Sequence, residues 1–98
     1  MLTSKELIVP IVFLIQQRIQ IHMRLNEHNP PHIHAFLGGN EAVFNLKGEM
    51  TKGNKKHFRK KDRKLISDWI KEYNTEIRNN WNNIENGEKV CKIQPHTK

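Results

Sequence analysis

The feature that most constrains the fold is a change of hydrophobic period along the chain. Residues 19–25 and 41–46 alternate between apolar and polar side chains, which is typical of half-buried β-strands. From about Arg59 the apolar residues recur every three or four positions, as in an amphipathic helix; they are Leu65, Ile66, Trp69, Ile70, Tyr73, Ile77, Trp81 and Ile84. A sheet followed by a helix that needs an apolar surface predicts an α+β fold.

The strand-like segments predict a mainly antiparallel sheet of three or four strands. Residues 11–15 either continue the first strand or form a separate short one. A second strand would span residues 32–37, and Gly38-Gly39-Asn40 predicts a tight hairpin to a third. A brief fourth strand is expected at most near residues 49–52. One C-terminal helix would cover the sheet, with a break near Asn74 and an extended arm docking after it.

The alternation also assigns the two faces of the sheet. One face would pack against the helix; it carries Ile19, Ile21, Met23, Leu25, Ile33, Ala35, Leu37, Ala42, Phe44 and Leu46. The other face would carry polar groups, namely Gln20, His22, Arg24, His32, His34, Glu41 and Asn45. We therefore expect His32 and His34 on an open, polar side of the sheet, with His28 at its rim.

Three of the six histidines fall within residues 28–34, around Pro30 and Pro31. The unperturbed pKa of histidine places its charge change between pH 5 and 8, so such a cluster can exchange protons, bind a metal or contact phosphate. The diproline restricts the backbone that enters the following strand. The segment is therefore a candidate site, although an exposed strand start without chemistry would show the same residues.

Three functional interpretations of this segment are open. The first is a metal-independent nuclease or transferase site without a cofactor, in which two of His28, His32 and His34 exchange protons with a ribose 2′-hydroxyl and the leaving oxygen while Arg24 steadies the phosphate. The second is a metal site made of two or three histidines with Glu27 or Glu41. The third is non-catalytic contact with nucleic acid or a partner protein. We favour the first.

The net charge of +7 is concentrated in residues 55–64, which carry +6 of it. If the helix begins this early, like charges four positions apart repel each other and positive charge opposes the helix dipole. A sequence that accepts both penalties indicates a use for the charge, and phosphate contact is the simplest. The expected nucleic-acid-binding residues are Lys55, Lys56, Arg59, Lys60, Lys61, Arg63 and Lys64.

Size and composition limit the protein class. Ninety-eight residues with 36% hydrophobic content predict a single domain, with a flexible extension at residues 1–9 and a frayed tail at residues 96–98. Cys91 is the lone cysteine, which excludes an internal disulfide. The longest apolar run, residues 7–15, is too short for a membrane span and lacks the features of a signal peptide. We expect a cytoplasmic protein.

Residues 26–35, Asn-Glu-His-Asn-Pro-Pro-His-Ile-His-Ala, resemble the N/D-E/D-H-x-P-P-H-x-H signature of a small bacterial family of unknown function. Further segments are similar to that family in the same order: residues 10–13, 41–44, 69–81 and 87–95. Residues 1–9 extend beyond its usual start. Its common serine cap before the helix is replaced here by Phe58-Arg59-Lys60.

Some members of that family are identified as DhiT-type toxins of type II toxin–antitoxin modules. The resemblance implies a toxin that a small cognate antitoxin neutralises by direct binding. It also implies that function depends on Glu27, His28, Pro30, Pro31, His32 and His34. Our hypothesis is a toxin that acts on RNA or the translation machinery. The alternative is a non-catalytic module that binds nucleic acid or a partner.

Overall fold

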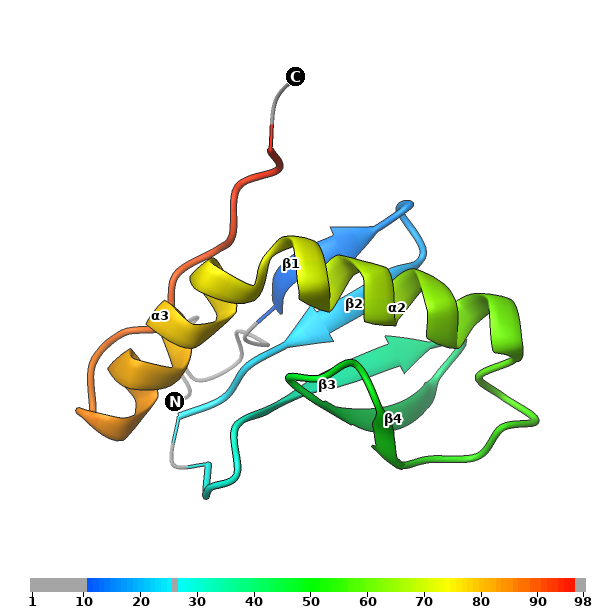
Figure 1. Ribbon diagram of the computed structural model, residues 1–98, viewed down its shortest axis with the longest axis horizontal. Coiled ribbons are helices and arrows are strands. Elements are labelled where there is room, and N and C mark those ends of the chain that lie inside the picture. Colours follow the sequence, from blue (N-terminus) through cyan, green and yellow to red (C-terminus); the bar gives the residue numbers. More distant parts are fainter. Residues whose placement is uncertain (1–10, 26, 97–98) are drawn as a thin grey trace, which may run out of the picture.

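The structure is a computed structural model that describes residues 11–25 and 27–96. Five strands come first, followed by two helices: β1 (Ile11–Ile15), β2 (Ile19–His22), β3 (His32–Leu37), β4 (Asn40–Asn45), β5 (Met50–Lys52), α2 (Lys60–Glu72) and α3 (Asn74–Glu85). Figure 1 shows α2 and α3 lying end to end across one face of the sheet. The predicted α+β class is confirmed. The extension predicted at residues 1–9 lies outside the described residues.

The sheet is an antiparallel meander in which the strands lie in the order β1-β2-β3-β4-β5. It has one strand more than the upper limit predicted, because residues 11–15 form a separate strand and β5 also forms. The β1–β2 turn contains Gln16 and Gln17 at φ 50° and 57°. Non-glycine residues rarely adopt positive φ, so the sequence gives little warning of a tight turn there.

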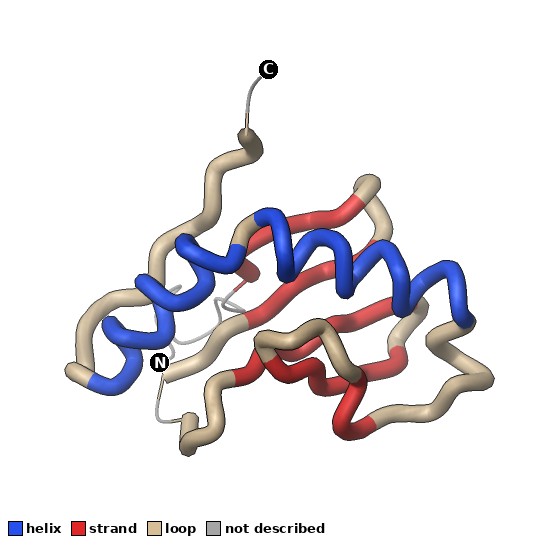
Figure 2. Tube along the Cα trace, viewed as in Figure 1, coloured by secondary structure: helices blue, strands red, loops and turns tan. Residues whose placement is uncertain are grey.

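The core lies between the sheet and the two helices (Figure 2). The predicted inner face is largely confirmed: Ile19, Ile21, Met23, Ile33, Ala35, Ala42 and Phe44 are all at most 1% exposed. Leu25 is an exception, with 51% of its surface exposed. The assignment of Leu25 is wrong because β2 ends at His22, and the alternation of a strand does not extend into the turn that follows.

The helix breaks where the sequence predicts. Tyr73 separates α2 from α3, and the Asn74 side chain donates to the Leu46 carbonyl at 3.2 Å. After α3 the chain returns as an extended arm, whose Ile93 N–H donates to the Val12 carbonyl at 2.9 Å. His96, expected in the frayed tail, stacks on Tyr73 at 4.0 Å between ring centroids. Residues 97 and 98 lie outside the described part of the chain.

Neither α2 nor α3, the helices of the described segments, is long and apolar enough to cross a lipid bilayer.

Candidate functional site

A pocket of about 370 Å³ opens beside the loop that precedes β3, and we call it the histidine pocket. One wall is the histidine segment, residues 27–32, together with His34. The other wall comes from β4 and β5 and consists of Val43, Asn45, Thr51 and Lys52. The antiparallel meander creates this wall, since β4 lies beside β3 and β5 lies beside β4. All three candidate catalytic histidines therefore line one pocket.

Glu27 connects the two histidines of β3. Its carboxylate lies 2.5 Å from His34 Nε2 and 3.5 Å from His32 Nε2. The two rings lie edge to face with centroids 5.1 Å apart, as expected for residues two positions apart on a strand. Glu27, His32 and His34 thus bring one carboxylate and two imidazoles together, with one potential ligand atom of each within 4.8 Å of the others.

The remaining ring nitrogens also have partners, and these fix the ring orientations. His32 Nδ1 lies 2.8 Å from the Pro30 carbonyl, to which it donates a hydrogen bond. His34 Nδ1 lies 2.6 Å from a carboxylate oxygen of Glu41. Each ring is therefore held through Nδ1, while its Nε2 faces Glu27.

His34 lies between two carboxylates. Both of its ring nitrogens are within hydrogen-bonding distance of a carboxylate oxygen, Nε2 of Glu27 and Nδ1 of Glu41. Burial of Glu27 alone would raise its pKa, but the hydrogen bond from His34 and the nearby charges of His34, His32 and Arg24 lower the pKa below its ordinary value. Glu27 is therefore held as a carboxylate.

The polar face is less open than the alternation predicts. His34 is 8% exposed and His22 only 3%. The His22 ring packs on Phe36 at 4.2 Å between centroids, and its Nε2 donates to Gln20 Oε1 at 3.0 Å. Burial, then the positive charges of Arg24 and His34, lower the pKa of His22, and Glu41 opposes them. The expectation of a solvated row of histidines is wrong at His22, because an aromatic neighbour covers it.

The other two predicted catalytic residues differ in position. His28 is exposed and lines the histidine pocket, and its side chain makes no hydrogen bond to another described residue. Arg24 lies outside the pocket lining; its Nη2 is 3.4 Å from Glu41 Oε2, and its guanidinium lies 5.7 Å from the Phe36 ring centroid. Arg24 therefore reaches His34 only through Glu41.

The sequence does not predict that Trp81 holds the loop before β3. Trp81 is 3% exposed, yet its Nε1 donates to Asn29 Oδ1 at 3.1 Å and its ring lies 5.1 Å from that of His32. Asn29 also donates to Glu85 at 3.0 Å. The helical spacing indicates only that Trp81 is buried, because its contact with a loop 52 positions away depends on tertiary structure. The sequence likewise does not predict that Lys52 lines the histidine pocket, because its position depends on the pairing of β5 with β4.

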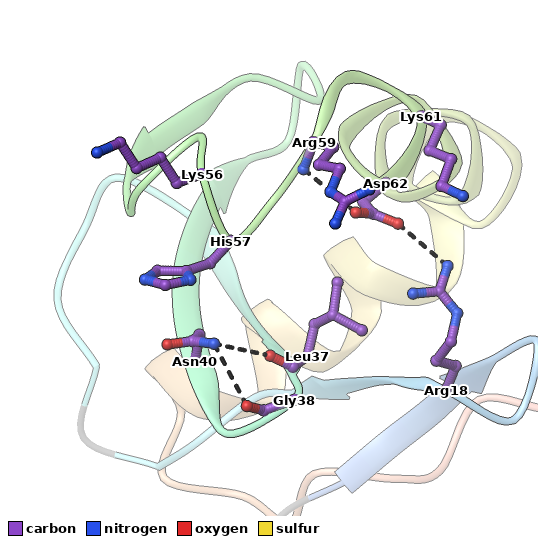
Figure 3. A pocket seen from close by; sticks show the side chains of 9 residues that line it. All are labelled: Arg18, Leu37, Gly38, Asn40, Lys56, His57, Arg59, Lys61 and Asp62. Atoms are coloured by element: carbon purple, nitrogen blue, oxygen red, sulfur yellow. Dashed lines mark hydrogen bonds and ion pairs between the residues drawn. The ribbon is translucent and has the colours of Figure 1, made fainter.

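The predicted nucleic-acid-binding residues lie at the other end of β3. A second pocket, of about 380 Å³, is lined there by Leu37, Gly38 and Asn40 and by basic residues around the start of α2 (Figure 3). Lys55, Lys56, Arg59, Lys60 and Lys61 are exposed, and we call these five residues the basic surface. The structure does not bring them next to the histidines: β3 separates the two by about 17 Å, at about 3.3 Å per residue.

Two predicted contact residues have intramolecular partners instead. Arg63 is half-buried and its Nη1 donates to the Phe58 carbonyl at 2.6 Å. Lys64 pairs with Asp68 at 2.8 Å, although both side chains are well exposed. Asp62, the acid within the basic run, is buried and accepts hydrogen bonds from Arg18 and from the Arg59 backbone. Arg63 and Lys64 are therefore less available to a ligand than the basic surface.

The histidine pocket can support two kinds of chemistry. Paired imidazoles beside a carboxylate can exchange protons with a bound substrate. Two imidazole nitrogens and a carboxylate oxygen that converge can also bind a transition metal.

Comparisons with known proteins gave one match. A family model described as "Domain of unknown function (DUF4160)" matches residues 18–82. These residues include the histidine segment, the basic surface and most of both helices. No curated protein matches the chain, and neither does any solved structure.

Proposed function

We propose that this chain, which belongs to the DUF4160 family because that family's model covers more than half of its length, is the toxin of a type II toxin–antitoxin module acting on RNA. The resemblance of residues 26–35 to a toxin-containing family supports the toxin role. In this proposal the protein acts in the cytoplasm and a small cognate antitoxin neutralises it. The observation that carries the proposal is the convergence of Glu27, His32 and His34 in one pocket.

The chemistry of the pocket favours RNA as the target. An imidazole could accept the proton of a ribose 2′-hydroxyl, a group that DNA lacks. The pocket volume of about 370 Å³ is of the size that accommodates a small ligand, such as a single nucleotide, and Lys52 on its wall could contact a phosphate. A single-stranded segment of several nucleotides would extend from the histidine pocket to the basic surface.

Inducible expression tests the role of the histidine pocket. We expect the parent protein to arrest growth and to cleave RNA in vitro, and we expect His34→Ala and Glu27→Gln to lose both effects. His96→Ala is the matched control, because His96 is an exposed histidine outside the pocket lining. Folding of each variant is checked by circular dichroism. If folded His34→Ala and Glu27→Gln arrest growth as strongly as the parent, the pocket is not the site of toxicity.

RNA binding tests the basic surface separately. Replacing Lys56, Arg59 and Lys61 by Gln should weaken RNA binding. The logarithm of the association constant should then fall less steeply with the logarithm of the salt concentration. The magnitude of this slope should decrease by about 2, since three contacts are lost and each phosphate contact of a single strand contributes about 0.7. The control replaces Lys71, Lys89 and Lys92, which removes the same charge elsewhere. Equal losses in both triple variants would contradict a localised RNA surface.

The alternative, a non-catalytic binding module, predicts a different pattern. RNA binding would depend on the basic surface, while the histidine variants would bind and inhibit growth as the parent does.

A further inference from the structure

We propose that Glu27, His32 and His34 together bind one divalent transition-metal ion, and that zinc is the ion that suits them best. This inference goes beyond the proposed action on RNA, because it makes the histidine pocket a metal centre. The inference does not rest on the proposed function, because its test measures metal binding and needs no substrate.

The spacing of the donor atoms is the first argument. The Glu27 carboxylate lies 2.5 Å from His34 Nε2 and 3.5 Å from His32 Nε2, and the three residues each offer a potential ligand atom within 4.8 Å of the others. Ligands that share a zinc ion at bond lengths of 2.0–2.2 Å lie about 3 to 3.5 Å apart. Glu27 belongs to a loop and His32 is half-buried, so both side chains can adjust by the small amount that this requires.

The orientation of the rings is the second argument. Metal-binding histidines usually donate their other N–H to a carboxylate or a backbone carbonyl, which fixes the tautomer and directs the free nitrogen at the metal. Both arrangements occur here: His32 Nδ1 donates to the Pro30 carbonyl at 2.8 Å, and His34 Nδ1 donates to Glu41 at 2.6 Å. Two rings positioned through Nδ1, with both Nε2 atoms facing one carboxylate, form a preorganised ligand set.

The donor types are the third argument. Two imidazole nitrogens with one carboxylate suit zinc and its neighbours, whereas magnesium and calcium favour oxygen ligands throughout. An ion at this position would take the place of the hydrogen bond between His34 Nε2 and Glu27. The charge of a divalent ion would be partly balanced by Glu27, which binds it, and by Glu41 behind His34.

The surroundings indicate a site that exchanges ligands. Three protein ligands leave at least one coordination position for water or substrate, as in catalytic zinc sites, and all three residues line the histidine pocket. With the Nε2 atoms of His32 and His34 bound to the ion, His28 is the histidine of the pocket that would be left to exchange protons with a substrate. Residues of the basic surface are too distant to contribute ligands.

Metal titration tests the site. Protein purified without a histidine tag is treated with chelator and titrated with Zn²⁺ by calorimetry, and then with Co²⁺ by visible absorption. We expect one equivalent to bind, with release of protons, and we expect zinc to raise the melting temperature. The absence of stoichiometric binding by the folded parent protein would overturn the proposal.

Variants locate the ion. His32→Ala and Glu27→Gln should abolish stoichiometric binding, while Glu41→Gln should weaken it by about 10- to 100-fold through loss of the partner of His34. His57→Ala and His96→Ala are matched controls and should bind as the parent does. His34 is buried, so if His34→Ala fails to fold, the half-buried His32 and the isosteric Glu27→Gln decide the question. Retention of full affinity in both of these variants would refute the site.

The metal result and the RNA result can fail independently. A protein that cleaves RNA in the presence of chelator, and binds no zinc, would retain the proposed function and lose the metal. A protein that binds one zinc ion through Glu27 and His32, but is neither toxic nor active on RNA, would retain the metal and lose the function.

Discussion

The guanidinium of Arg18 donates a 3.0 Å hydrogen bond to the buried carboxylate of Asp62. Arg18 is the last residue of the β1–β2 turn and Asp62 lies in the first turn of α2, so the pair joins the first hairpin to the start of the helix (Figure 3). The other oxygen of Asp62 accepts the backbone N–H of Arg59 at 3.2 Å. Asp62 thereby places a negative charge where the helix dipole favours one, amid basic residues that oppose it.

Replacing Asp62 by Asn should lower the free energy of unfolding by about 1–2 kcal/mol, because the charge at the helix N-terminus and the ion pair are both lost. Urea denaturation measures this change. Asp68→Asn is the control, since Asp68 is an exposed acid of the same helix whose pairing with Lys64 should contribute at most about 0.5 kcal/mol. Equal effects of the two substitutions would contradict a special role for Asp62.

Replacing Trp81 by Phe should loosen the loop before β3 without emptying the core. The change preserves an aromatic ring but removes the Nε1–H that donates to Asn29, a bond worth about 1 kcal/mol. Amide hydrogen exchange of residues 27–29, the part of this loop that carries backbone N–H groups, should become faster. Trp69→Phe is the matched control, because Trp69 Nε1 is buried without a hydrogen-bond partner in the described structure. If both variants leave exchange in this loop unchanged, Trp81 does not restrain it.

Replacing Gly48 by Ala should destabilise the protein more than the same change at Gly38. Both glycines have positive φ, at 89° and 57°, so each substitution strains the backbone by about 1–2 kcal/mol. A Cβ at Gly48 would also lie 2.3 Å from Ser67 Oγ on α2, whereas none of the described structure lies within 4 Å of one at Gly38. Thermal unfolding should show the larger loss for Gly48→Ala, and Ser67→Ala should partly restore it.

The docking of the C-terminal arm should depend on pH. The hydrogen bond from His96 to Glu76 is the largest cause that raises the pKa of His96, and it also lowers the pKa of Glu76. The contact is therefore complete between the ordinary pKa of a glutamate and that of a histidine. It is lost as the pH rises through the raised pKa of His96, and also as the pH falls through the lowered pKa of Glu76.

A proton NMR titration checks this interpretation of the arm. His96 should titrate above the ordinary histidine value in the parent protein, and closer to that value in Glu76→Gln. Because both side chains are exposed, the effect on global stability should be small. A His96 pKa that is identical in the parent and in Glu76→Gln would show that the pair does not form in solution.

Much of the fold follows from the hydrophobic pattern. Burial is periodic in both strands and helices, so residues such as Ile21, Phe44 and Ile70 can be assigned to the core from spacing alone. The separate β1 could not be assigned, since the Gln16-Gln17 turn contains no residue that favours positive φ. The pattern also failed at Leu25, because alternation does not show where a strand ends.

The sequence predicts which histidines belong to the site, but it does not predict the contacts that they make. The spacing of His32 and His34 places both rings on one side of β3, and the structure holds them 5.1 Å apart. The contact of Glu41 with His34 depends on the register of β3 against β4, in which His34 lies opposite Val43. A single sequence does not supply that register, nor does it show that the basic run would pack beside Leu37 instead of beside His32.

The imidazoles of the histidine pocket, and the two carboxylates that contact His34, all come from one short stretch of chain, residues 27–41, which forms a loop and the hairpin after it. The rest of the protein therefore serves as the frame that holds this segment. Substitutions in the helices should then change stability before they change the geometry of this segment, and Trp81 is the point at which α3 contacts it.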